Sequence, residues 1–97
     1  MDKSEFVAST AAEAPPAGVS APLVALWWLK KGDWTRAHEV VQPFETGDGA
    51  WVHAHLHRVE GDLSNAAYWY RQAGRPTCVS ALPNEWDEIA VALLRER

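Results

Sequence analysis

Residues 49–74, GAWVHAHLHRVEGDLSNAAYWYRQAG, decide the fold because they predict two helices joined by a tight turn. At the turn, Gly61 accepts the left-handed conformation that ends a helix, and Asp62 or Ser64 accepts the free amides that open the next one. Asp48 is the predicted N-cap of the first helix. The second helix carries an apolar stripe at helical spacing. This stripe consists of Leu63, Ala66, Ala67 and Tyr70.

Length and composition indicate one small soluble globular domain. The chain has 97 residues, 47% of them hydrophobic, and a net charge of −4. Nine basic against thirteen acidic residues argue against binding to nucleic acid or to an anionic membrane. We expect no membrane span and no signal peptide, since no apolar run is long enough for either. The single cysteine, Cys78, is typical of a reducing compartment, and we therefore predict a cytoplasmic protein.

The rest of the chain divides into an arm and a helical domain. Residues 1–19 are rich in alanine, proline and serine and predict a flexible N-terminal arm, within which a short helix over residues 4–13 is an alternative. Residues 20–97 predict a single helical-repeat domain. We expect an all-α fold of about five helices, made of two stacked helical hairpins and a C-terminal capping helix.

Capping residues mark the other helices. Ser20 is the predicted N-cap of a helix that ends at Gly32, and Asp33 opens a helix that Pro43 stops. The inward stripe of this second helix consists of Trp34, Ala37, His38 and Val41. Asn84 is the predicted cap of the last helix, whose apolar stripe must pack on the helices before it.

The turn Gly32-Asp33 repeats the turn Gly61-Asp62, and the residues around the two turns match. The matching pairs are Ala25 with Ala54, Trp34 with Leu63, Ala37 with Ala66, and Val41 with Tyr70. Small residues at facing positions let two antiparallel helices pack closely. The chain here resembles tetratricopeptide repeats over residues 21–76, and the segment AYWYRQA of residues 67–73 is also similar to the shorter Sel-like repeats.

This resemblance implies a scaffold that binds a peptide or protein along the first helix of each pair. The implied partner-binding residues are Leu26, Leu29, Lys30, Trp51, His55 and Arg58. The sequence departs from the family at His53 and His57, where a leucine and an aromatic residue are expected. Two units also fall short of the usual three, so the last helix must complete the core, and a homodimer is another way to cover the remaining aromatic surface.

The histidines on the first helix of the hairpin carry a second hypothesis. On a helix, His53 and His57 share a face, and Glu60 lies three residues further on. An i, i+4 histidine pair with a carboxylate fits zinc or iron. The alternatives are that these histidines pack as core residues with polar tips, or that they serve a partner-binding or pH-sensing role.

Motifs for catalysis are missing from the sequence. It has no phosphate-binding glycine loop, no nucleophile elbow and no paired metal-ligand cysteines. We therefore predict no enzymatic activity, no catalytic residues and no cofactor. The favoured function is a small protein–protein interaction module, and the alternative is a metal-binding protein using His53, His57 and Glu60.

Overall fold

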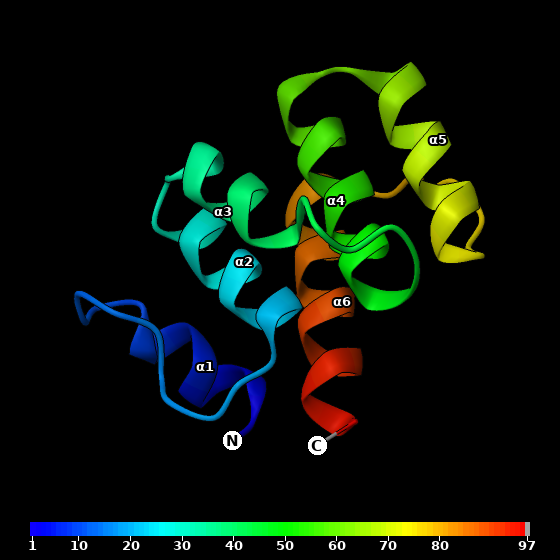
Figure 1. Cartoon of the computed structure of the whole chain (residues 1–97). Coiled ribbons are helices and arrows are strands. Elements are labelled where there is room, and N and C mark those ends of the chain that lie inside the picture. Colours follow the sequence, from blue (N-terminus) through cyan, green and yellow to red (C-terminus); the bar gives the residue numbers. More distant parts are fainter. Residues whose placement is uncertain (97) are drawn as a thin grey trace.

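Six α-helices make up the part of the chain that the computed structural model describes, residues 1–96 (Figure 1). They are α1 (Lys3–Ser9), α2 (Ala21–Lys30), α3 (Trp34–Val41), α4 (Gly47–Glu60), α5 (Leu63–Ala73) and α6 (Leu82–Arg95). The predicted all-α class is confirmed, with one helix more than the expected five. Residue 97, the last residue of the predicted domain, lies outside the described residues. Within residues 1–96, every helix is too short or too polar to cross a lipid bilayer.

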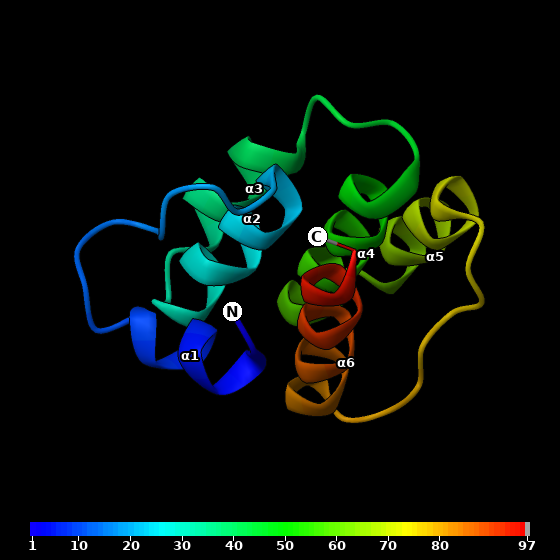
Figure 2. The same cartoon turned by 90° about the horizontal axis from the view of Figure 1, so that it is seen from below.

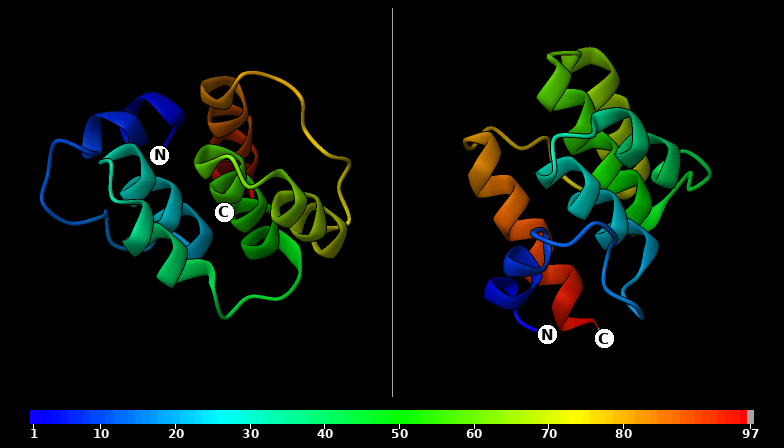
Figure 3. Two further views of the ribbon diagram at one scale, coloured as in Figure 1. Left: turned by 90° about the horizontal axis from the view of Figure 1, so that it is seen from above. Right: turned by 90° about the vertical axis from the view of Figure 1, so that its left-hand side faces the viewer.

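The helices pack in two neighbouring pairs with α6 laid across them. Helix α2 packs on α3, α4 packs on α5, and α2 and α3 both contact α4. Helix α6 contacts α2 and α4, so it covers the face that these two helices form (Figure 2). Helix α1 lies against α6 and α2, beside the first pair (Figure 3).

The two Gly-Asp turns form as predicted. The side chain of Asp33 accepts a hydrogen bond from the backbone N–H of Arg36 at 3.0 Å, and Asp62 accepts one from Asn65 at 3.2 Å. Gly61 ends α4 with φ of 85°, a conformation that costs glycine little. Local capping chemistry therefore sets the turn between α4 and α5, and it is Asp62 that serves as the cap.

Two helix starts differ from the prediction. Helix α4 begins ahead of Asp48, with Thr46 at the N-cap position. Asp48 therefore lies in the first turn, where its carboxylate interacts favourably with the positive end of the helix dipole. Helix α6 begins at Leu82, so Asn84 lies inside it instead of capping it. Pro83 fits in the first turn because the amide that proline lacks has no helical partner there.

The N-terminal segment is more ordered than the flexible arm predicted for residues 1–19. Asp2 caps α1 through a capping box, and Phe6 of α1 is fully buried. The ring of Phe6 stacks on Trp86 of α6 with centroids 5.9 Å apart. Lys31 donates to two carbonyl oxygens just after α1, at 2.9 and 2.7 Å. The segment is held in place because Phe6 fills part of the core.

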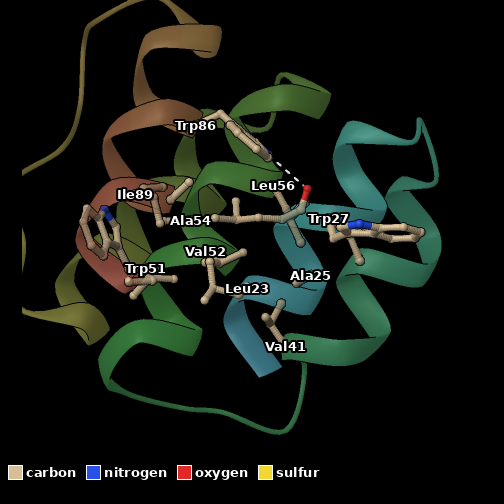
Figure 4. Close-up of a cluster of buried hydrophobic side chains, with 14 of the residues drawn as sticks. Leu23, Ala25, Trp27, Val41, Trp51, Val52, Ala54, Leu56, Trp86 and Ile89 are labelled. Carbon is tan, nitrogen blue, oxygen red and sulfur yellow. Dashed lines mark hydrogen bonds between the residues drawn. The ribbon is translucent and has the colours of Figure 1, made fainter. Parts of the chain in front are cut away.

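The hydrophobic core lies between α2, α4 and α6 (Figure 4). The Nε1 of Trp86 donates to the carbonyl oxygen of Leu26 at 3.0 Å, which fixes this indole at the junction of α6 and α2. Other buried members of the core are Leu23, Ala25, Trp27, Val52, Ala54, Leu56 and Ile89. The apolar stripe of α6 thus packs on the first helix of each pair.

Candidate metal centre

Helix α4 carries three histidines at alternate positions, and the helical twist sends them to different faces. His53 and His57 lie one turn apart and contact His38 of α3, whereas His55 contacts Glu85 of α6. The relative exposures of His53, His55 and His57 are 3%, 1% and 6%. The structure therefore separates His53 and His57 from His55, as helical spacing requires.

Helix α3 completes a group of three histidines by bringing His38 against this pair. The Nε2 of His38 lies 3.0 Å from the Nε2 of His53. One ring nitrogen from each of His38, His53 and His57 lies within 4.8 Å of the other two. We call these three residues the histidine cluster. It joins the α2–α3 pair to the α4–α5 pair.

Glu60 fixes the ring of His57 from outside the cluster. Its Oε1 lies 2.5 Å from the Nδ1 of His57. A carboxylate in this position accepts a hydrogen bond from Nδ1–H, and the lone pair of the neutral ring is then on Nε2. Histidines that bind metals usually donate their second ring N–H to such a carboxylate.

Two indoles stack on the histidine cluster. Trp69 of α5 stacks on His53 with centroids 3.9 Å apart, and Trp34 of α3 stacks on His38 at 4.9 Å. The Nε1 of Trp34 donates to the carbonyl oxygen of Leu56 at 2.7 Å. These contacts leave the two imidazoles little freedom to rotate.

The surroundings of the cluster favour neutral imidazoles. Burial, followed by the neighbouring His38 and His57, lowers the pKa of His53 from 6.5 to about 4. Burial and then His57 also lower the pKa of His38. Both rings are therefore neutral at pH 7, which is the form that binds a metal. In addition, the Nδ1 of His53 is buried with no hydrogen-bond partner among the described residues.

The opposite face of α4 holds a separate buried network centred on Glu85 of α6. The Nδ1 of His55 and the Nη1 of Arg58 lie 2.6 and 2.7 Å from Oε1 of Glu85, and the hydroxyl of Tyr70 donates to Oε2. Burial opposes ionisation of Glu85, but the hydrogen bonds from these three residues outweigh it and hold its pKa below the usual value. The sequence analysis missed this network, because a glutamate in a first helical turn looks like a residue placed for the helix dipole.

The predicted partner-binding residues lie mainly beneath α6. Leu26, Trp51 and His55 are buried. Arg58 is engaged by Glu85 and by the carbonyl oxygen of Ser80, the latter at 2.6 Å. Of the two remaining residues, Leu29 is partly exposed and Lys30 is exposed.

The predicted metal-binding residues come together in part. His53 and His57 meet as expected, while Glu60 contacts the Nδ1 of His57 and is not a member of the cluster. The sequence analysis placed His38 on an inward stripe but did not assign it to the site. The inward position of His38 on one helix, opposite the inward pair on the next, was the available signal.

Comparison with protein families, with curated proteins and with solved structures finds no match to this chain.

Proposed function

We propose that this protein binds a divalent transition-metal ion, with Zn²⁺ as the first candidate, through the histidine cluster. The observation that carries the proposal is the convergence of ring nitrogens from His38, His53 and His57 within 4.8 Å. Three histidine nitrogens are an established ligand set for zinc.

The spacing of the Nε2 atoms of His38 and His53 is close to what a metal requires. Two ligands at a Zn–N distance of about 2.05 Å in a tetrahedral arrangement lie about 3.4 Å apart. The Nε2 atoms of His38 and His53 are 3.0 Å apart, so a shift of a few tenths of an ångström accommodates the ion. When the Nδ1 of His57 donates to Glu60, the lone pair of the neutral ring lies on Nε2, where a metal can bind it.

Packing alone explains the cluster less well. Burial and the neighbouring imidazoles disfavour protonation of His38 and His53. A metal ion binds imidazoles in their neutral form, so surroundings that disfavour protonation favour metal binding. The metal hypothesis thus accounts for a polar cluster at a position where apolar residues pack more easily.

Calorimetric titration with Zn²⁺ near neutral pH tests the proposal. We expect one ion per chain, and we expect His57→Asn to weaken binding at least tenfold. Asparagine places an amide near the position of Nδ1, so the hydrogen bond to Glu60 survives while the Nε2 ligand is lost. His38→Phe, which preserves the stack on Trp34, is expected to act in the same way.

Two control variants separate the cluster from other zinc ligands. His55→Asn removes a histidine outside the cluster and keeps a donor for Glu85, and Cys78→Ser removes the single thiol. Both are expected to bind zinc like the wild type. Binding that is lost in Cys78→Ser, or unchanged in both cluster variants, contradicts the proposal.

A second candidate function is the tetratricopeptide-like interaction module, favoured by an open cavity beside α6. This cavity has a volume of about 270 Å³ and includes three of the residues that the resemblance implies. Its lining residues are Leu29, Lys30, His55, Val59, Leu82, Pro83 and Trp86. We infer an acidic peptide segment with one apolar side chain as the partner, since the cavity is largely apolar and Lys30 supplies a cation. A second copy of the chain and a cytoplasmic location remain predictions.

Selection of binders from a random peptide library tests this second candidate. We expect acidic peptides to be enriched and Lys30→Glu to weaken their binding at least tenfold, because it replaces the attracting charge with a repelling one. Leu63→Glu is the matched control, since Leu63 is 66% exposed and lies outside the cavity. Equal loss in both variants, or no enrichment of acidic sequences, contradicts the interaction module.

A further inference from the structure

The histidine cluster provides three ligands, one fewer than a tetrahedral metal takes. Within residues 1–96, the group of mutually close donor atoms that contains His38 and His53 has only His57 as its third member. Structural zinc sites usually have four protein ligands, whereas sites that act on a bound molecule keep the fourth position for water or substrate. With three protein ligands, the histidine cluster has the ligand count of a site that keeps its fourth position for water or substrate.

The two nearby carboxylates are engaged elsewhere. Glu60 and Asp62 form a different group that shares only His57 with the cluster. Glu60 accepts from the Nδ1 of His57 at 2.5 Å. Asp62 accepts from the backbone N–H of Asn65 at 3.2 Å as the cap of α5. Both carboxylates therefore hold other contacts and lie outside the group that contains His38 and His53.

The cluster lies close to the surface. His53 and His57 are buried, but His38, Trp34 and Trp69 are each half-buried. A small molecule therefore has only a short distance to travel from solvent to the ring of His38. Three neutral imidazoles also leave both positive charges of the ion uncompensated at the metal, and this favours an anion as the fourth ligand.

We propose that the metal in the histidine cluster keeps one coordination position open for a water molecule or a small monodentate anion. The inference rests on the proposed metal binding, but it makes a separate statement: the fourth ligand comes from solution. The open position gives the site the ligand set of a Lewis-acid centre, in which bound water ionises more readily than free water.

Cobalt substitution tests the two statements separately. Co²⁺ accepts the same nitrogen ligands as Zn²⁺ but has visible d–d absorption, so the metal-free protein is first titrated with Co²⁺ and then with sodium azide. We expect a one-to-one visible spectrum on adding Co²⁺, and a saturable shift of its bands on adding azide. Failure to form the cobalt spectrum contradicts metal binding itself. A cobalt spectrum that azide leaves unchanged contradicts only the open position.

Variants of the two carboxylates identify what fills the position if azide does not. Glu60→Gln keeps an oxygen for the Nδ1 of His57 and is expected to leave the azide response intact. Glu60→Ala is expected to weaken Co²⁺ binding roughly 10–100-fold, because the ring of His57 loses its orientation, while the bound ion still responds to azide. An azide response that appears only in Glu60→Ala or in Asp62→Ala shows that this carboxylate is the fourth ligand and overturns the inference.

Discussion

Replacing Glu85 by alanine is expected to lower the free energy of unfolding by about 3–5 kcal/mol. The carboxylate is buried and accepts from His55, Arg58 and Tyr70. Its removal leaves a largely buried guanidinium without its counter-charge and two further donors without an acceptor. Such a loss costs far more than the net contribution of the intact pair, because the desolvation of the remaining groups is no longer offset.

Urea denaturation followed by tryptophan fluorescence measures this effect. Glu85→Gln keeps the volume and one acceptor oxygen, and we expect it to cost about 1–3 kcal/mol, which keeps the variant measurable if the alanine variant does not fold. Glu88→Ala, one turn along α6 and exposed, is the matched control and is expected to change stability by less than about 0.5 kcal/mol. Similar costs for Glu85→Ala and Glu88→Ala contradict the assigned role of Glu85.

The Glu85 network explains why α6 occupies the face of α2 and α4. Arg58 lies on α4 and Tyr70 on α5, so one carboxylate ties α6 to both helices of the second pair. Trp86, the next residue, bonds to the backbone of α2. Because α6 covers α2 and α4, the surface of these helices that was predicted to bind a partner is left with the open cavity that includes Leu29 and Val59.

Local features of the sequence predicted the helices and most of their ends. Gly61 and Asp62 specify a turn by their own conformational and hydrogen-bonding preferences, and these act within a few residues. Helix α1 has a local start signal as well, the capping box of Asp2 and Glu5, but local signals do not show that this helix joins the core. It is ordered through contacts such as Phe6 with Trp86, residues far apart in sequence, and no local pattern encodes such a pair.

The same distinction applies to the candidate site. Helical spacing correctly paired His53 with His57, since both lie on one helix. His38 required knowledge of how α3 packs on α4, and Glu85 required knowledge of where α6 lies. Spacing also associated Glu60 with His57, and the structure places its carboxylate at Nδ1, a detail that spacing alone does not show.

The buried polar groups on the two faces of α4 have different kinds of partner. Towards α6, His55 meets a carboxylate whose charge is balanced by Arg58, and its partners are complete. Towards α3, His53 meets other histidines, and one of its nitrogens has no partner among the described residues. A stable core needs only the first arrangement. The second arrangement disfavours protonation of His38 and His53, and it makes the protein sensitive to acid.

Acidification of the metal-free protein from pH 7 to pH 5 is expected to lower its free energy of unfolding by about 2 kcal/mol through His53 alone. In the folded protein the pKa of His53 is lowered from 6.5 to about 4, first by burial and then by His38 and His57. Between these two values the unfolded chain binds a proton that the folded chain does not, so stability falls as the pH falls. The lowered pKa of His38 acts in the same direction.

Urea denaturation at several pH values between 7 and 5, with a chelator present, measures this dependence while most carboxylates remain ionised. His53→Phe is the informative variant, because phenylalanine can retain the stack on Trp69 but binds no proton. Its stability is expected to vary with pH by about 2 kcal/mol less than that of the wild type over the same range. An equal pH dependence in the two proteins contradicts the view that the folded state holds His53 neutral. It also removes one of the reasons for expecting this imidazole to be ready to bind a metal at neutral pH.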